Sequence, residues 1–150
     1  EHGLVLACNE GAVMTVGFGH RYPSVEVWST SRVDQPWRVD DEGIDAVSDL
    51  LHAAHVAVSD DVPANEEWHY RPMGTGVTVP WRIILKLRIS TLAGFEGGTK
   101  IYVNTISPAA LAAMLLPKLF QARAAGRIAP MDLGDECEIP RGALAATWVR

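Results

Sequence analysis

The 150-residue sequence has few cysteines and no surplus of positive charge, and both shortages exclude classes of protein. Its two cysteines, Cys8 and Cys137, lie far apart and belong to no CxxC or Cys/His spacing, so the sequence predicts neither a metal site nor a disulfide framework. The net charge of -5 argues against general nucleic-acid binding, because such proteins need excess Lys and Arg to displace phosphate counterions. We therefore expect no metal, no cofactor and no nucleic-acid partner.

Long hydrophobic runs are also missing. No apolar run approaches the roughly 20 residues that a membrane-spanning helix needs, and the first residues do not resemble a signal peptide. The sequence therefore predicts a soluble, cytoplasmic protein without membrane contact. The chain begins with Glu1 and not with Met, inside a predicted strand, so we expect that a preceding segment was removed or lies on another chain.

The apolar residues, 48% of the sequence, recur with the periods of strands and helices. Residues 3–18 form two apolar runs around a turn, which predicts an antiparallel hairpin, and residues 25–30 alternate as a third strand. From 41 to 60 the apolar positions recur every three or four residues, which predicts an amphipathic helix. Further strands are predicted over 68–72, 76–90 and 99–106. Ser107 before Pro108 is typical of a helix start, and Pro117 is expected to kink or split that second helix.

This order of elements predicts an α+β fold. We expect a domain over residues 1–125, with an antiparallel sheet of about five strands and two main helices. The Pro and Gly spacing of residues 126–150 predicts an extended C-terminal arm.

The predicted strand at residues 80–89 has one apolar and one basic face. Its apolar positions are Trp81, Ile83, Leu85, Leu87 and Ile89. Arg82, Lys86 and Arg88 share the opposite face because side chains alternate along a strand. Such a strip can bind phosphate oxygens. The alternative is that it only solvates the exposed face of an antiparallel sheet.

The segment that follows, STLAGFEGGTKIYVNTISPAALAAML at residues 90–115, resembles the C-terminal half of the galactose-1-phosphate uridylyltransferase-like branch of the histidine-triad superfamily. In that branch a strand similar to HWHIEIYPR runs into a loop similar to AGFELGTGxYIN and a helix that begins SPE or TPE. Upstream, HRYPSVEVWST at residues 20–30 is similar to the RYPFEVWI strand of the family. The resemblance covers about residues 4–120, and it implies a histidine-triad-like (HIT-like) sheet and a nucleotidyltransferase-related protein.

The catalytic histidines of that branch have no counterpart here. The HxH pair would fall on Pro80 and Arg82, the acid that follows it on Ile84, and no HPH motif occurs. The resemblance therefore implies a degenerate half-domain without catalytic residues, which pairs with a second, catalytic HIT-like domain of the same or another chain. The alternative is a binding or assembly module that holds an anionic ligand or a partner protein.

The resemblance also implies which residues bind a nucleotide sugar or sugar phosphate. They are Arg82, Lys86, Arg88, Gly94, Phe95, Glu96, Gly98, Thr99 and Asn104. In the related transferases the AGFE loop enters the active site of the partner half, which implies sugar contacts for Phe95 and Glu96. Glycines in such a loop permit positive φ and a close backbone approach. The alternative is an ordinary glycine-rich hairpin turn with a solvated glutamate.

The histidines are less informative. His52 and His55 could share a metal on one helix, but surface histidines fit that spacing as well. His69, beside Glu66 and Glu67, is the best candidate for a general acid or base, although a structural role is the alternative. His20 is interpreted as a residue that packs a loop. Edge strands without evident Pro or charge predict a dimer or heteromer.

Overall fold

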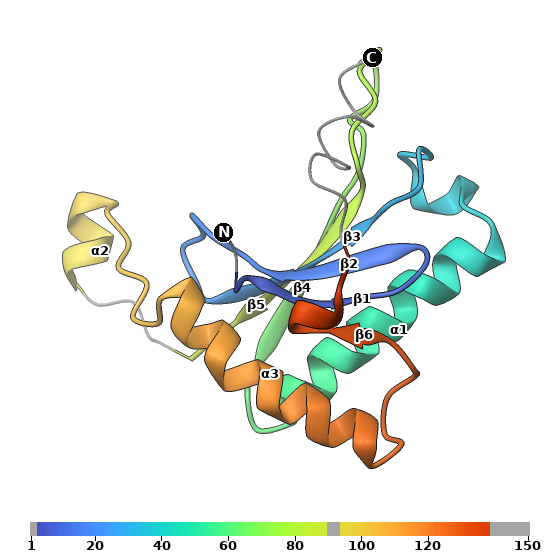
Figure 1. Cartoon of the computed structure of the whole chain (residues 1–150). Helices are drawn as coiled ribbons and strands as arrows, with labels where there is room; N and C mark the ends of the chain where they lie inside the picture. The colour runs from blue at the N-terminus through green and yellow to red at the C-terminus, as the bar shows by residue number, and fades with distance from the viewer. Residues whose placement is uncertain (1–2, 90–93, 139–150) are drawn as a thin grey trace.

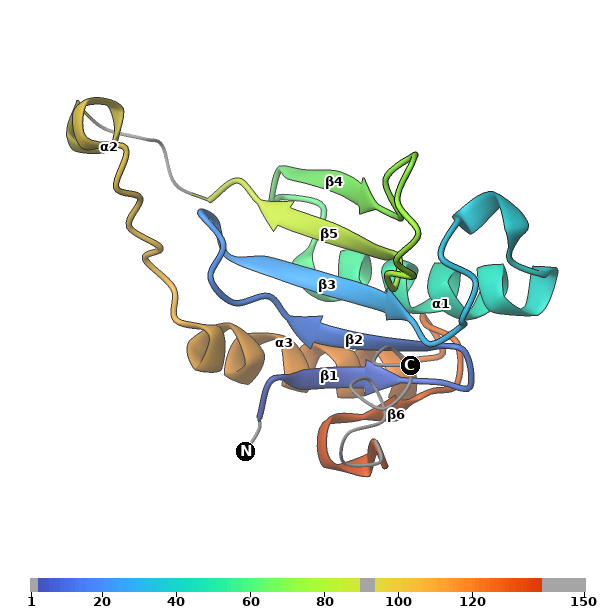
Figure 2. The same cartoon turned by 90° about the horizontal axis from the view of Figure 1, so that it is seen from above.

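A six-stranded antiparallel sheet with helices on one face forms the body of the molecule (Figure 1). The computed structural model describes residues 3–89 and 94–138. The strands are β1 (Val5–Cys8), β2 (Ala12–Val16), β3 (Ser24–Ser29), β4 (Ala64–His69), β5 (Arg82–Leu87) and β6 (Asp132–Leu133). Their order across the sheet is β4-β5-β3-β2-β1-β6, which Figure 2 shows from above. The predicted α+β class is confirmed, with one strand more than the five or so expected.

The predicted hairpin is formed by β1 and β2. The side-chain oxygen of Asn9 fixes its turn by accepting hydrogen bonds from the backbone N–H groups of Gly11 and Ala12. Gly11 cannot be replaced without a shift, because an added Cβ would lie 2.7 Å from the Cβ of Ala46. This close approach brings the hairpin against the helix that follows β3.

Two long helices, α1 (Asp41–Val58) and α3 (Pro108–Ala124), pack on the same face of the sheet. Side-chain oxygens of Asp40 and Ser107 cap their N-termini, and acidic residues occupy the first turn of α1, where the helix dipole favours them. Pro117 does not split α3, which continues through it to Ala124.

The core lies between these helices and the sheet. Ile83, Leu85 and Leu87 of β5 are buried there with Val25 and Val27 of β3. The predicted apolar face is therefore confirmed for Trp81, Ile83, Leu85 and Leu87, but not for Ile89, which is 41% exposed. The opposite face of the sheet, which we call the open face, carries no long helix of the described residues (Figure 1).

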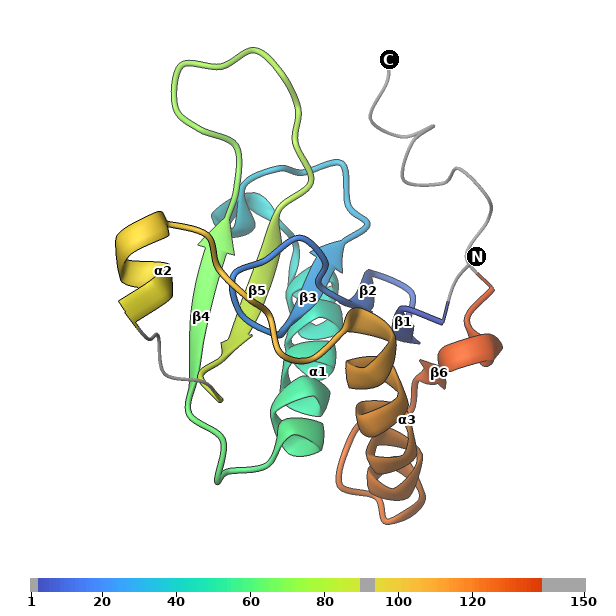
Figure 3. The ribbon, with the colours of Figure 1, turned by 90° about the vertical axis from the view of Figure 1, so that its left-hand side faces the viewer.

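Three predicted strands have other bounds or are absent. The segment predicted at 68–72 is strand only to His69 and begins earlier, at Ala64, and that predicted at 76–90 is strand only from Arg82 to Leu87. Residues 100–106 form no strand. The connection between β4 and β5 instead extends beyond the sheet, away from the helices (Figure 3).

A short helix, α2 (Gly94–Thr99), stands apart from the body in Figures 1 and 2 and is joined to α3 by residues 100–106. We call residues 94–106 the arm. Two 3-10 turns complete the described elements, η1 (Pro36–Arg38) and η2 (Gly134–Glu136). In the described part of the chain no helix is long and apolar enough to cross a membrane.

Candidate ligand-binding site

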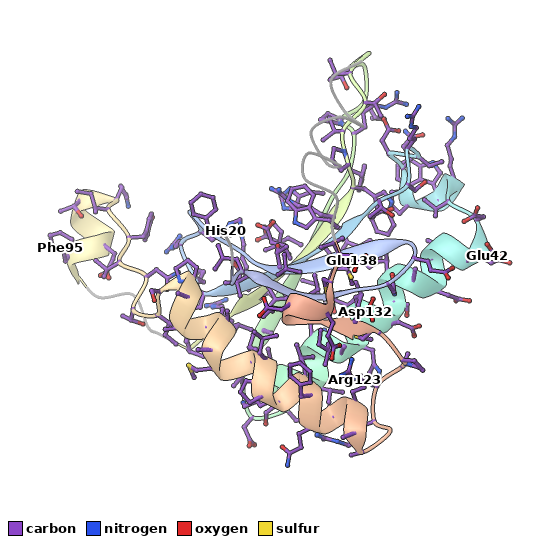
Figure 4. The ribbon with its side chains drawn as sticks, viewed as in Figure 1. His20, Glu42, Phe95, Arg123, Asp132 and Glu138 are labelled. Carbon is purple, nitrogen blue, oxygen red and sulfur yellow. The ribbon has the colours of Figure 1, made fainter. Side chains whose placement is uncertain are left out.

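Arg82 lies on the open face of the sheet, where a carboxylate neutralises it. Its guanidinium stacks on Trp28, its partner in the β3–β5 register, with 4.3 Å between Cζ and the ring centroid. Its Nη1 is 3.8 Å from Oε2 of Glu26, whose side chain is 8% exposed. The imidazole of His20 contacts the other oxygen of Glu26 (Figure 4 labels His20 on this side of the sheet). Glu26 is therefore shared by one cation and one histidine.

A second carboxylate repeats this arrangement on the other side of β5. Glu67 of β4 accepts a hydrogen bond from Nζ of Lys86, and its other oxygen is 3.4 Å from Nε2 of His69. The hydrogen bond from Lys86 is the main reason why the pKa of Glu67 lies below its usual value, and His69 adds to it. Arg82 and Lys86 share one face as predicted, but Glu26 and Glu67 compensate their charges.

Arg88 differs from both, because its contacts are with neutral groups. It follows the end of β5, donates from Nη1 to Oδ1 of Asn65 at 3.2 Å and lies over the ring of Tyr22, 5.3 Å from its centroid. Arg21 lies 5.4 Å from the centroid of the same ring and 3.8 Å from that of Tyr102. We call these four residues, Arg21, Tyr22, Arg88 and Tyr102, the Tyr22 cluster.

The Tyr22 cluster is the most basic part of this site. No carboxylate of the residues that the structure describes forms an ion pair with Arg21 or Arg88, and both side chains are exposed. Two guanidinium groups held on aromatic rings, without a competing acid, can donate hydrogen bonds to the phosphate oxygens of a ligand. The sequence analysis proposed Arg88 but missed the rest of the cluster. The available signal was the RY pair just before the EVW strand.

The Tyr22 cluster connects the arm to the body, because Tyr102 belongs to the arm and its ring contacts Arg21. Phe95 is 58% exposed and lies on α2, remote from the body (Figure 4). Glu96 is partly buried. The arm therefore presents an aromatic ring and an acid beyond the end of the sheet that carries Arg21 and Arg88.

The polar residues of the arm are used locally. The hydroxyl of Thr99 donates to the carbonyl oxygen of Phe95 at 2.7 Å and accepts from the N–H of Ile101. The side-chain oxygen of Asn104 accepts from the N–H of Ile106. Both contacts shape the backbone of the arm.

The expectation for the glycines of the arm was wrong in one respect. Residues 94–99 are helical, not a hairpin turn, and neither Gly94 nor Gly98 has a positive φ. Nothing lies within 4 Å of a Cβ added to either residue. There is therefore open space beside α2 at both glycines. Packing within the described chain does not require glycine at either position. Ala93, which belongs to the quoted motif, lies outside the described residues.

The position that the resemblance assigns to an acid is occupied by an apolar residue, Ile84. Ile84 is 2% exposed and sits between Glu26 and Glu67 in the sheet register. Of the remaining histidines, His55 contacts Glu66 at 2.8 Å. No group of three or more His, Cys, Asp or Glu side chains among the described residues is arranged to hold a metal ion.

Comparisons with known proteins identify the fold. The family model described as "Domain of unknown function (DUF4921)" matches residues 1–146. No curated protein matches the chain.

Three solved structures share this architecture. An ADP-glucose phosphorylase from Arabidopsis thaliana with bound ADP-glucose is 21% identical with a TM-score of 0.68, over 75% of this chain and 39% of that one. A GalT-like protein from Arabidopsis thaliana is 20% identical with a TM-score of 0.65, over 75% and 41%. A uridylyltransferase mutant is 17% identical with a TM-score of 0.67, over 81% and 44%. The chain thus spans less than half the length of each, and the predicted HIT-like fold is confirmed.

Proposed function

The chain belongs to the family described as Domain of unknown function (DUF4921), and we propose that it is a non-catalytic, HIT-like half of a hexose-1-phosphate nucleotidyltransferase-type protein. In this proposal it binds the phosphates of a nucleotide sugar or sugar phosphate and pairs with a catalytic HIT-like copy. The pairing brings its arm to the sugar end of the ligand.

One observation carries the proposal: Arg21 and Arg88 flank Tyr22 without a carboxylate partner among the described residues. An arginine already paired with an acid must give up that partner before it binds an anion, whereas Arg21 and Arg88 need not. Arg88 is therefore the main phosphate ligand of the proposed site. Arg82 and Lys86 are secondary ligands that require Glu26 and Glu67 to move.

The absence of transfer activity follows from chemistry. Transfer through a covalent intermediate needs a nucleophile that takes the nucleotidyl group. The resemblance assigns it to an HPH motif, which this sequence lacks, and the HxH pair falls on Pro80 and Arg82. Two histidines lie near Arg82: His69 is its partner in the β4–β5 register, and His20 shares Glu26 with it. The Nε2 of His20 is already engaged by Glu26, which supports a packing role.

Calorimetry with two classes of ligand tests the proposal. The variant Arg88→Ala should bind UDP, ADP and their glucose conjugates about 10- to 100-fold more weakly, as expected for the loss of a charged hydrogen bond worth about 1.5–3 kcal/mol. The control Arg127→Ala removes the same charge from an exposed position beyond α3 and should leave the affinity unchanged. Glu96→Ala should weaken only the ligands that carry a sugar.

Two results would contradict the proposal. Equal affinities for wild type, Arg88→Ala and Arg127→Ala would remove the phosphate site. Stable, acid-labile label on a histidine after incubation with radiolabelled UDP-glucose or ADP-glucose would show that the chain is catalytic.

The alternative is an assembly module that binds a partner protein and no nucleotide. It is favoured by exposed apolar side chains on two projecting segments, the arm and the β4–β5 connection. They are Phe95, Ile101 and Val103 on the first and Met73 and Val77 on the second. Absence of any nucleotide binding, together with a partner that is lost on mutation of these residues, would favour this module.

A further inference from the structure

Cys8 and Cys137, 129 positions apart in the sequence, meet at the β1–β6 edge of the sheet. Cys8 is the last residue of β1 and pairs with Asp132 of β6 in the sheet register. Cys137 follows η2, and its thiol donates to the carbonyl oxygen of Asp132 at 3.3 Å. Because both residues contact Asp132, the two thiols lie close together, and Cys8 is near enough to raise the pKa of Cys137. Both thiols are free and half-buried.

Contacts of the preceding residue hold Cys137 in this position. Glu136, the preceding residue, forms a two-point pair with Arg123 of α3, with 2.5 and 2.9 Å between nitrogen and oxygen. One oxygen of Glu136 also accepts from the N–H of Leu133 at 3.0 Å. The segment is therefore fixed to α3 and to β6 before any bond between the sulfurs forms. A disulfide requires that kind of preset approach, because its geometry tolerates little displacement of the backbone.

A small oxidant has access to Cys8. The residue lines an open hollow of about 940 Å³, together with Arg123, Asp132 and Glu138, which Figure 4 labels at the same end of the molecule. Cys137 is not among the residues that line this hollow. An oxidant that enters this hollow therefore meets Cys8 and not Cys137.

We propose that Cys8 and Cys137 form a redox modification site, which a low-molecular-weight disulfide such as oxidised glutathione converts into one intramolecular disulfide. The Cys8 thiolate attacks one sulfur of oxidised glutathione and releases one glutathione thiolate. The Cys137 thiolate then attacks the Cys8 sulfur of the mixed disulfide and releases the second glutathione. The protein loses two electrons and two protons, and the oxidant is reduced to two thiols.

The second step should be slow at neutral pH. Burial raises the pKa of the Cys137 thiol, as do the neighbouring Cys8 side chain and the carboxylate of Asp132. Because only the thiolate attacks a disulfide, few Cys137 side chains are reactive at pH 7. The mixed disulfide at Cys8 therefore accumulates at pH 7 and closes faster at pH 9.

The product would join β1 to the segment that follows β6 and would close nearly the whole described chain into a loop. A cross-link over such a long loop restricts the unfolded state strongly. The site is remote from the Tyr22 cluster, so nucleotide binding on the open face should not change. Failure of this proposal and failure of the proposed function are thus separable.

Intact-mass analysis and peptide mapping of the full chain, treated with oxidised glutathione at pH 7 and pH 9, test the proposal. We expect a single glutathione adduct on Cys8 that converts into a Cys8–Cys137 cross-link, with faster conversion at pH 9. The cross-link should raise the Tm by about 5–10 °C, and dithiothreitol should reverse the rise.

Two variants make the result unambiguous. Cys137→Ser should stop at a stable glutathione adduct on Cys8, and Cys8→Ser should react much more slowly than wild type. Stable adducts on both cysteines of the wild type without a cross-link would overturn the proposal. So would unmodified folded protein under conditions in which the urea-unfolded chain reacts completely.

Discussion

Glu26 determines the charge of the open face at the scale of single residues. Its two oxygens contact His20 and Arg82, and its side chain is nearly buried. While Glu26 is ionised, the positive charge of Arg82 is largely cancelled and less available to a phosphate. The same contacts stabilise the fold, since Glu26 joins the β2–β3 turn to β5.

Replacing this acid should therefore have opposite effects on binding and on stability. In Glu26→Gln the guanidinium of Arg82 is released, and the affinity for UDP or ADP should rise about fivefold, equivalent to roughly 1 kcal/mol for a partly exposed pair. The free energy of unfolding should fall by about 1–2 kcal/mol because a charged hydrogen bond is weakened. Calorimetry and urea unfolding measure the two effects.

The control for this change is Glu10→Gln, which removes the same charge from an exposed turn residue. It should alter neither quantity by more than a few tenths of a kcal/mol. A Glu26→Gln variant that binds nucleotides more weakly than wild type would show that Glu26 supports the ligand directly.

The sequence could predict which residues of β5 share a face, but not which charges are compensated. Alternation is local, so the common face of Arg82 and Lys86 follows from their spacing. Their partners, Glu26 and Glu67, come from β3 and β4, and the pairing depends on the register of three strands. Register is a tertiary property, and a single sequence does not reveal it.

The arm shows the same limit at the scale of elements. The apolar residues at 99–106 predicted a strand, but these residues form no strand in the structure. Such a pattern only indicates that the segment has an apolar and a polar side, and it does not show that another strand lies beside it. Three glycines made a helix at 94–99 unexpected, because glycine is a poor helix former. The hydrogen bond from the Thr99 hydroxyl to Phe95 and that from the N–H of Lys100 to Glu96 stabilise this short turn locally.

Helix capping, in contrast, was predictable and can be measured. The Ser107 oxygen accepts from the N–H of Ala110 at the start of α3, so Ser107→Ala should lower the free energy of unfolding by about 1 kcal/mol. Ser48→Ala makes the same chemical change at an exposed position inside α1 and should be neutral or stabilising by up to about 0.5 kcal/mol, because alanine favours helix interiors. Equal effects of the two changes in urea unfolding would contradict the capping role.

The η2 turn should respond to acid through Glu136. The two-point hydrogen bond from Arg123, and then the N–H of Leu133, lower the pKa of Glu136 to about 2 from an ordinary value of 4.5. A carboxyl with a lowered pKa stabilises the folded state above its unfolded pKa, and this contribution is lost as the pH falls from about 4.5 to 2. Glu136→Gln should therefore lower the Tm at pH 7, and the difference from wild type should shrink through that window.

Asp135→Asn is the matched control for this titration, because Asp135 is the exposed neighbour in the same turn. Its Tm should follow that of wild type at each pH between 7 and 2. A Glu136→Gln difference that stays constant over the window would show that the carboxylate charge is not responsible.

At the scale of the whole molecule, the edges of the sheet differ from expectation. The sequence analysis expected edge strands without protective charge, but the edge strand β4 carries Glu66, Glu67 and His69, and the other edge, β6, has two residues. Charged and short edges disfavour pairing with another sheet. β6 lies within residues 126–150, the predicted C-terminal extension. The predicted domain boundary between residues 125 and 126 stays a prediction.

The pairing that we propose, with a second copy or another HIT-like domain, would therefore depend on the arm. Its exposed apolar residues project from the body, and burying an aromatic side chain there would provide much of the binding energy of an interface. We expect the chain to associate at micromolar concentrations, with itself or with a catalytic copy added to it, and Phe95→Ser to weaken this association at least tenfold. Analytical ultracentrifugation over a concentration series measures both.

The control for the arm is Met73→Ser, which removes a 96% exposed apolar side chain from the β4–β5 connection. If the arm forms the interface, Met73→Ser should associate like wild type, and all three proteins should share one Tm as monomers, because neither side chain belongs to the core. If both substitutions weaken association equally, the association is a non-specific hydrophobic one and not a specific contact of the arm. A wild-type chain that stays monomeric, alone and with the catalytic copy, would leave the arm without a role in pairing.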